Sequence, residues 1–286
     1  MIVVSLVATK GGVGKTTTAA NLGGLLADAG LRVLLVDLDV QPTLSSYFQL
    51  THRAPGGVYE LLALNERNLE RLISNTTIPN LDLVISNDDR GQLNTLLLHA
   101  PDGRLRLRHL LSAFRKDYDV VLADTQGARS VLLETAVLAS DIALSPVTPE
   151  LLAARELRRG TLQLLQDVAP FRNWGIEPPP LHLLINRVHP VSANAKLICD
   201  TLRHVFGSEP GVSVLQTSIP ALEVYPRAST LGLPVHRIES RRPTGRNAPA
   251  AAETVRALAC ELFPQWTETL ERNAERSQRG VGGTHA

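Results

Sequence analysis

A glycine-rich segment between a strand-like run and a helix-like run constrains this chain more than any other feature. Residues 9–17 read TKGGVGKTT; the apolar, β-branched run Ile2–Ala8 precedes them, and an amphipathic stretch from Thr16 to Ala29, ended by Gly30, follows. Glycines let the backbone curl until successive N–H groups point inward, and the start of a helix adds partial positive charge. The segment therefore predicts a loop that holds phosphate groups at the edge of an α/β sheet.

The residue types in this loop predict what each of them contributes. Lys15 would reach the β- and γ-phosphates of a nucleotide, and the hydroxyl of Thr16 would bind Mg²⁺. The ordinary spacing of such loops asks for glycine where this chain has Thr9, and Lys10 instead directly precedes the glycines. The predicted nucleotide-binding loop comprises Gly11, Gly12, Val13, Gly14, Lys15, Thr16 and Thr17.

Short apolar runs alternate with helical patterns along most of the chain, which predicts an α/β fold: a doubly wound, mainly parallel sheet flanked by helices. The predicted strands are Ile2–Ala8, Arg32–Asp37, Leu81–Ser86, Tyr118–Asp124, Asp141–Val147, Leu181–Asn186 and Val212–Ser218. The predicted helices are Thr16–Ala29, Arg104–Phe114, Ser130–Ser140, Glu150–Val168 and Ala193–Phe206. We expect one domain over residues 1–276 and a disordered tail over residues 277–286.

Acidic side chains follow two of the predicted strands. Asp37 and Asp39 come at the end of RVLLVD, and Asp124 ends the strand YDVVLAD. The carboxyl ends of parallel strands meet at the edge that also presents the phosphate loop. We therefore expect Asp39 to orient a water on the γ-phosphate, Asp124 to support the metal, and Asp37 to support either Mg²⁺ or the loop.

Composition narrows the class of protein. The 29 basic and 28 acidic residues give a net charge of +1, which argues against a surface coated in basic charge, and 44% hydrophobic residues exclude a wholly disordered chain. The start, MIVVSLVATKGG, lacks the basic region of a signal peptide, and Cys199 and Cys260 are too few for a disulfide framework. These features predict a cytoplasmic protein.

Three motifs resemble those of the ParA/MinD family of P-loop ATPases. The family's deviant loop, KGGxGK(S/T), matches Lys10–Thr16; its second motif, DxDPQ, resembles DLDVQ with Val40 in place of proline. Its third motif, DxPP, resembles DTQG, where Gln126 and Gly127 replace the prolines. Ile219–Pro220 and the GLPV stretch Gly232–Val235 resemble later landmarks of the partition branch.

The resemblance implies a mechanism as well as a fold. In this family two subunits sandwich two ATP molecules, and the lysine that matches Lys10 reaches the partner's nucleotide. Carried over, Lys15 and Thr16 bind phosphate and Mg²⁺, and Asp39 positions the attacking water. Asn186 and Pro220 match positions near adenine. Hydrolysis would loosen the dimer, so that a slow ATPase acts as a timer.

The partition branch binds DNA without sequence preference, and one stretch of this chain is a candidate for that role. Residues 227–246 contain Arg227, Arg237, Arg241, Arg242 and Arg246 against a single acidic residue, Glu239. Such a cluster could contact DNA phosphates, and the alternative is a solvated loop with scattered arginines. The resemblance implies a nucleoid-associated protein released from DNA by a ParB-like activator.

Two other functions remain open at this level. A MinD-like protein would attach to a membrane through a terminal amphipathic helix, but the end of this chain after Trp266 has only Leu270 and Val281 as large apolar residues. A metabolic ATP-dependent enzyme on the same fold would need a second substrate pocket. Nucleotide-dependent retention on arbitrary DNA would separate the partition function from both.

Overall fold

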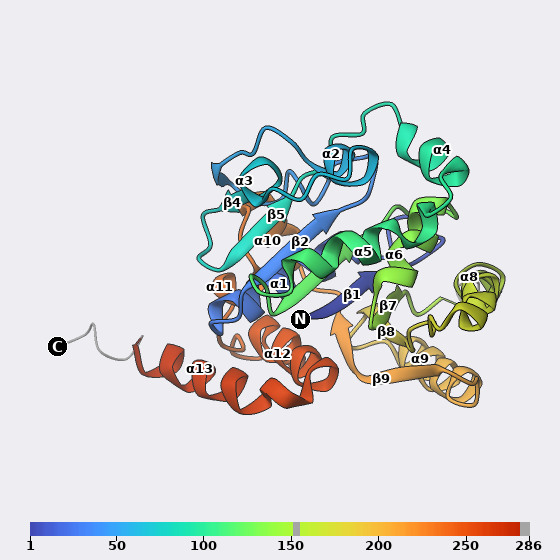
Figure 1. Cartoon of the computed structure of the whole chain (residues 1–286). Coiled ribbons are helices and arrows are strands. Elements are labelled where there is room, and N and C mark those ends of the chain that lie inside the picture. The colour runs from blue at the N-terminus through green and yellow to red at the C-terminus, as the bar shows by residue number, and fades with distance from the viewer. Residues whose placement is uncertain (151–154, 281–286) are drawn as a thin grey trace.

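The computed structural model describes residues 1–150 and 155–280, and the described residues form a nine-stranded sheet with helices on both faces (Figure 1). The strand order is β3-β4-β5-β2-β6-β1-β7-β8-β9. The strands are β1 (Ile2–Leu6), β2 (Val33–Asp37), β3 (Leu50–His52), β4 (Ser74–Thr76), β5 (Leu81–Val84), β6 (Val120–Asp124), β7 (Ile142–Val147), β8 (Leu181–Val188) and β9 (Val212–Pro220).

All strand pairs from β5 to β9 are parallel, and only the edge pairs β3–β4 and β4–β5 are antiparallel. The α-helices are α1 (Lys15–Asp28), α2 (Val58–Ala63), α3 (Leu69–Leu72), α4 (Gln92–His99), α5 (Arg106–Leu111), α6 (Val131–Ala139), α8 (Gln163–Val168), α9 (Ala193–Phe206), α10 (Val224–Leu231), α11 (Val235–Ile238), α12 (Ala251–Leu262) and α13 (Thr267–Gly280). The mainly parallel, doubly wound architecture predicted from the sequence is therefore confirmed.

The central strands are buried because helices cover both of their faces. Alternate side chains of one strand enter different clusters: Val4 of β1 packs in the cluster that includes α1 and α12, whereas Val3 packs in the cluster that includes α5 and α6. This burial on both faces explains the nearly continuous apolar sequence of these strands. A third cluster joins α6, α8 and α9 to the β7–β8 side of the sheet.

The predicted strands all occur, with ends shifted by no more than two residues. The helix predicted over Arg104–Phe114 is broken into the 3₁₀ turn η1 (Gly103–Leu105), α5 and the 3₁₀ turn η2 (Ser112–Phe114). Residues 151–154 of the helix predicted over Glu150–Val168 lie outside the described residues. Residues 155–168 are helical and contain a π-helical turn, η3 (Arg158–Leu162), whereas Glu150 lies outside the helix.

Helix α13 closes the described part of the chain. It ends at Gly280 and so includes residues 277–280 of the predicted tail, while residues 281–286 lie outside the described part. Leu270 of α13 is 2% exposed, and the ring of Trp266 packs at a tilt against that of Phe263, with 5.3 Å between the ring centroids, so that α13 is held to the end of α12. The edge strands β3 and β4, the helices α2 to α4 and the helices α10 to α13 were not predicted.

Candidate functional site

The phosphate loop connects β1 to α1 and has the backbone its glycines predict. Gly12 and Gly14 have φ angles of 74° and 98°, in the left-handed region that favours glycine, and Gly14 is the N-cap of α1. Val13 is buried between them. Because Gly14 lacks a side chain to cap the helix, the first N–H groups of α1 are available to an anion at this end.

An asparagine from the far side of the sheet holds this loop in place. The side-chain amide of Asn186, at the end of β8, donates a hydrogen bond of 2.7 Å to the carbonyl oxygen of Val13. The contact is so close that a Cβ atom added at Gly14 would lie 2.2 Å from the Asn186 amide nitrogen. Asn186 thus supports the phosphate loop through its side-chain amide.

Gly14→Ala should destabilise the nucleotide-free protein by about 1–3 kcal/mol, because the new side chain combines a left-handed φ with a clash. Urea unfolding would measure the change. The matched control is Gly11→Ala, since a Cβ atom at Gly11 meets nothing within 4 Å. Equal stability of the two variants would contradict this geometry.

Lys15 lies inside the site, next to acidic groups. It is 7% exposed, and burial lowers the pKa of its ammonium group, whereas the charges of Asp124 and Asp39 act in the opposite direction. The register of the sheet pairs Asp37 of β2 with Asp124 of β6. The structure therefore brings together the lysine and the three acidic residues that the sequence placed at this edge.

Asp124 and Thr16 form the part of the site suited to a metal bound with phosphate. The Thr16 hydroxyl donates to one carboxylate oxygen of Asp124 at 2.5 Å, and the other carboxylate oxygen is buried without a partner in the described residues. Burial raises the pKa of Asp124 to about 7. An orphaned carboxylate oxygen beside a threonine hydroxyl fits Mg²⁺ held mainly by phosphate and water. Within residues 1–150 and 155–280, no group of three or more His, Cys, Asp or Glu side chains could hold a metal by itself.

Asp37 has its own partners and serves the loop that follows β2. One oxygen accepts the backbone N–H and the hydroxyl of Ser45, both at 2.7 Å, and the other accepts the N–H of Asp39 at 3.2 Å. Burial raises its pKa to about 6. Of the two predicted roles for Asp37, the geometry favours support of the loop. That loop carries Asp39, whose carboxylate accepts the N–H of Gln41 at 3.0 Å.

The second loop lysine lies elsewhere. The Lys10 ammonium is 3.1 Å from Glu156 and 3.5 Å from Glu150, and its side chain is 41% exposed. Hydrogen bonding to Glu156 is the main cause that raises its pKa.

The motif that follows β6 packs against the phosphate loop, because a Cβ atom at Gly127 would lie 2.7 Å from the backbone of Gly11. Glycine at that position lets the two loops touch.

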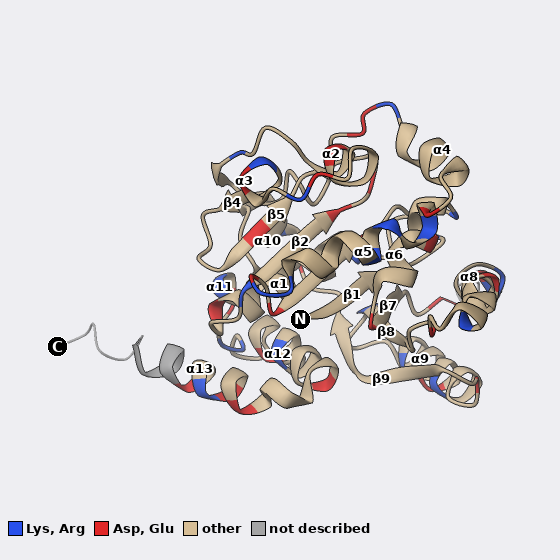
Figure 2. Cartoon of the chain, viewed as in Figure 1, with Lys and Arg blue, Asp and Glu red and all other residues tan. Residues whose placement is uncertain are grey.

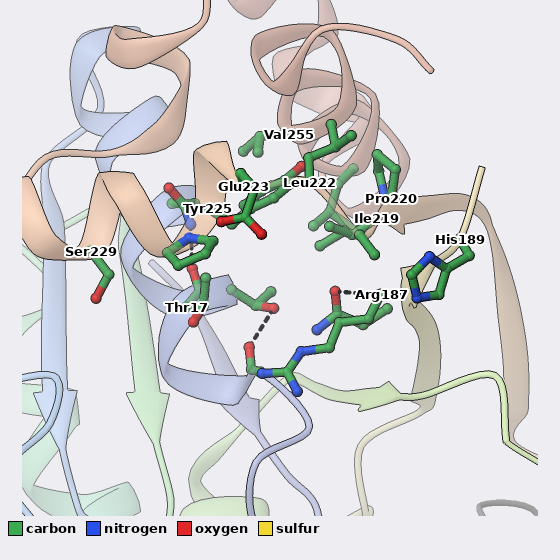
Figure 3. A pocket seen from close by; sticks show the side chains of 17 residues that line it. Thr17, Arg187, His189, Ile219, Pro220, Leu222, Glu223, Tyr225, Ser229 and Val255 are labelled. Carbon is green, nitrogen blue, oxygen red and sulfur yellow. Dashed lines mark hydrogen bonds between the residues drawn. The ribbon is translucent and has the colours of Figure 1, made fainter. Parts of the chain in front are cut away.

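A cavity of about 510 Å³ opens beside the start of α1 (Figure 3). Ile219, Pro220 and Leu222 supply apolar surface, while Asn186, Arg187 and Glu223 supply polar groups. An apolar wall with a few polar groups next to a phosphate loop suits a nucleoside. Both residues predicted near the base, Asn186 and Pro220, line this cavity. The sequence did not lead us to predict Arg187, His189 and Glu223 as lining residues. Arg187 could have been noticed because it directly follows Asn186, the polar residue that ends a predicted strand.

The predicted DNA-binding cluster does not form one free basic surface. Arg237 donates two hydrogen bonds to Asp28, at 2.7 and 2.5 Å, and Arg246 pairs with Glu239. These two arginines therefore hold α11 and the following loop to the fold, and their charges are engaged within the chain. Arg227 and Arg242 are exposed, and none of the ion pairs in the described residues involves them; Arg241 has a partner of its own.

Asp28→Asn should destabilise the protein by about 1 kcal/mol at pH 7. The expected loss is this small because Asp28 is partly exposed, and solvent screens its interaction with the neighbouring charges. Burial alone would raise the pKa of Asp28, but hydrogen bonds from Arg237 and His236 outweigh it and bring the pKa to about 2. Because the pKa of Asp28 in the folded protein lies below its unfolded value near 3.8, the ionised group stabilises the fold at pH values above 3.8. This contribution to stability disappears as the pH falls toward 2. Urea unfolding at pH 7 and 3 should therefore show the difference from wild type shrinking, and a difference independent of pH would count against the ion pair. The exposed Asp89→Asn is the control.

A strand, a glycine-rich loop and a helix that bury a lysine beside a threonine–aspartate pair define a P-loop nucleotide-binding protein. The family model described as an AAA domain matches residues 1–173. The chain belongs to the ParA/MinD family of P-loop ATPases.

Relatives and solved structures agree with this assignment. The septum site-determining protein MinD of Helicobacter pylori is 32% identical, over 69% of this chain and 71% of that protein, and the sporulation initiation inhibitor protein Soj of Bacillus subtilis is 32% identical over 57% and 66%. An McdA variant from Cyanothece in complex with ATP shares the fold, with a TM-score of 0.72 at 20% identity over 96% of this chain and 95% of that one. Cobyrinic acid a,c-diamide synthase from Mycobacterium smegmatis with bound ADP and magnesium has a TM-score of 0.67 at 26% identity, over 87% of this chain and 98% of that one.

Proposed function

We propose that this chain is a ParA-like partition or positioning ATPase that dimerises on ATP, binds double-stranded DNA non-specifically and is released by slow hydrolysis. Family membership supports ATP hydrolysis in general, and the names of three relatives refer to chromosome partitioning or to septum-site determination. The activator would be a ParB-like centromere-binding protein, and the site of action the nucleoid within the cytoplasm.

The observation that carries the proposal is the separation of the two loop lysines. Lys15 is buried in the site, whereas Lys10 is exposed, and its ion-pair partners among the described residues are side chains that are themselves 60% and 47% exposed. Such surface pairs contribute little, so a triphosphate on a second subunit would compete readily for Lys10. One lysine thus serves its own nucleotide and the other is available to a partner's.

The catalytic assignments follow from the same geometry. Thr16 and Asp124 would hold Mg²⁺, which would neutralise charge on the phosphates when bound. Asp39, two residues after the end of β2, would orient the attacking water. With one carboxylate for this task, turnover should be slow until an activator rearranges the loops.

We propose a narrower DNA-contacting surface than the one predicted from the sequence. With Arg237 and Arg246 engaged by Asp28 and Glu239, we assign the contact to Arg227 and Arg242, with Arg241 beside them. Exposed arginines exchange counterions for DNA phosphates, so retention should weaken steeply with salt.

The deciding experiment is retention of the full chain on arbitrary duplex DNA with ATP, with ADP and without nucleotide, at about 50 and 200 mM salt. We expect retention with ATP alone, and its loss in Lys15→Ala. Retention on DNA that does not depend on the nucleotide would contradict the proposal that ATP controls DNA binding. Flotation with anionic liposomes instead of DNA retention would indicate the membrane function.

The charge and packing of α13 weigh against that membrane function. Its described side chains include Glu268, Glu271 and Glu275 against Arg272, and acidic and basic positions are interspersed along the helix (Figure 2). Its buried Leu270 already packs on the core. None of the described helices is long and apolar enough to span a bilayer.

A metabolic ATP-dependent enzyme is the second candidate, because the likeness to the diamide synthase extends over most of both chains. A smaller cavity of about 370 Å³ shares Arg187, His189 and Ala221 with the nucleotide cavity and could admit a second substrate. ATP turnover that requires an added small acid, with no retention on DNA, would favour this function.

A further inference from the structure

Arg187 occupies an unusual backbone position at the edge of the nucleotide cavity. Its φ is 60°, in the left-handed region that non-glycine residues seldom adopt. The register of β8 against β9 shifts between Asn186 and Val188, which pair with the consecutive residues Ile219 and Pro220, so Arg187 is bulged out of the ladder. Bulges beside a site commonly redirect a side chain.

The same asparagine that holds the phosphate loop also holds this bulge. The Asn186 side-chain oxygen accepts the backbone N–H of Arg187 at 2.9 Å while its amide donates to Val13 at 2.7 Å. The two bonds join the end of β8 to the phosphate loop. The position of Arg187 is therefore coupled to the loop that would hold the nucleotide.

The exposed side chain of Arg187 lines the cavity and has no carboxylate partner among the described residues. Figure 3 shows it running from the end of β8 toward the first turn of α1, and Gly14, Thr17 and Arg187 line the same cavity. None of the ion pairs and side-chain hydrogen bonds in the described residues involves its guanidinium group, although Glu223 lines the cavity as well.

The guanidinium group of Arg187 and the positive end of α1 thus face one cavity, and Lys15, whose side chain is buried, directly follows Gly14 of its lining. Like charges in proximity repel unless an anion joins them, and guanidinium forms forked hydrogen bonds to phosphate oxygens. We propose that Arg187 is a phosphate-contact residue of the nucleotide site, which binds the polyphosphate from the cavity beside the first turn of α1. This inference rests on the proposed ATP site and adds a second cation from the same chain.

The test compares ATP and adenosine, displacing a fluorescent ATP analogue with Mg²⁺ present, on the full chain and three variants. Arg187→Gln should lower the affinity for ATP by about tenfold or more, as expected for one charge-assisted contact, and change that for adenosine less than twofold. Arg187→Lys should retain part of the ATP affinity. The surface variant Arg115→Gln should match wild type.

Arg187→Gly separates binding from folding. Because the left-handed φ suits glycine, this variant should melt at the wild-type temperature or above without nucleotide, yet show the same loss of ATP affinity. Unchanged ATP affinity in Arg187→Gln, an equal loss for ATP and adenosine, or a lowered melting temperature in Arg187→Gly would each overturn the inference. A wild-type chain that fails to bind ATP would instead overturn the proposed function.

Discussion

Lys15→Ala should raise the dissociation constant for ATP by at least about 100-fold, because it removes a buried charge from a site built around it. Lys15 is 7% exposed, and burial lowers the pKa of its ammonium group despite the nearby charges of Asp124 and Asp39. Without Lys15, the phosphates would meet those carboxylates with no buried ammonium group between them. Calorimetry with Mg²⁺ and ATP would measure the loss.

Two further variants make this result interpretable. Lys15→Gln keeps most of the side-chain volume and should lose ATP affinity to a similar extent, whereas Lys196→Ala alters an exposed lysine on α9 and should bind as wild type does. ATP affinity that survives both changes at Lys15 would refute the assignment of the phosphate loop.

Asp39→Ala should leave ATP affinity within about threefold of wild type and lower turnover by at least about 100-fold, the range of a lost general base or water-orienting group. Asp39 follows β2 and lies near enough for its charge to act on Lys15 and Asp124, but it makes no hydrogen bond to the phosphate loop among the described residues. With hydrolysis blocked, the ATP-bound dimer should accumulate.

Asp39→Asn is the matched variant, because its amide oxygen can still accept the N–H of Gln41 and preserve the turn. It should lose turnover as the alanine variant does while keeping the loop intact. Light scattering with ATP would report the dimer. A monomer under saturating ATP, or wild-type turnover in either variant, would remove Asp39 from the mechanism.

The phosphate loop and the parallel strands were predictable because their causes are local in sequence. Glycine spacing sets the backbone of residues 11–14, and runs such as Val33–Asp37 are apolar throughout because both faces of a central strand are covered. The sequence also predicted that Asp37 and Asp124 lie at the same edge of the sheet, since neighbouring parallel strands end at a common edge. The short edge strands β3 and β4 have no such pattern and were missed.

The roles of individual polar side chains depended on partners far away in the chain. Arg237 is engaged by Asp28, 209 residues earlier, and Asn186 holds Val13, 173 residues earlier. The spacing of residues in the sequence cannot reveal such contacts. Two arginines of the predicted DNA-binding cluster, Arg237 and Arg246, therefore turned out to form ion pairs within the chain. The bulge that directs Arg187 arises from how β8 meets β9 and Asn186.

By itself, the sequence determined the class of fold, the place of the phosphate loop and the acidic residues at its edge, because backbone torsion and hydrophobic periodicity are properties of neighbouring residues. Only the tertiary structure decided which cations remain available to a ligand, because a charge is free or neutralised according to what folding brings within a few ångströms of it.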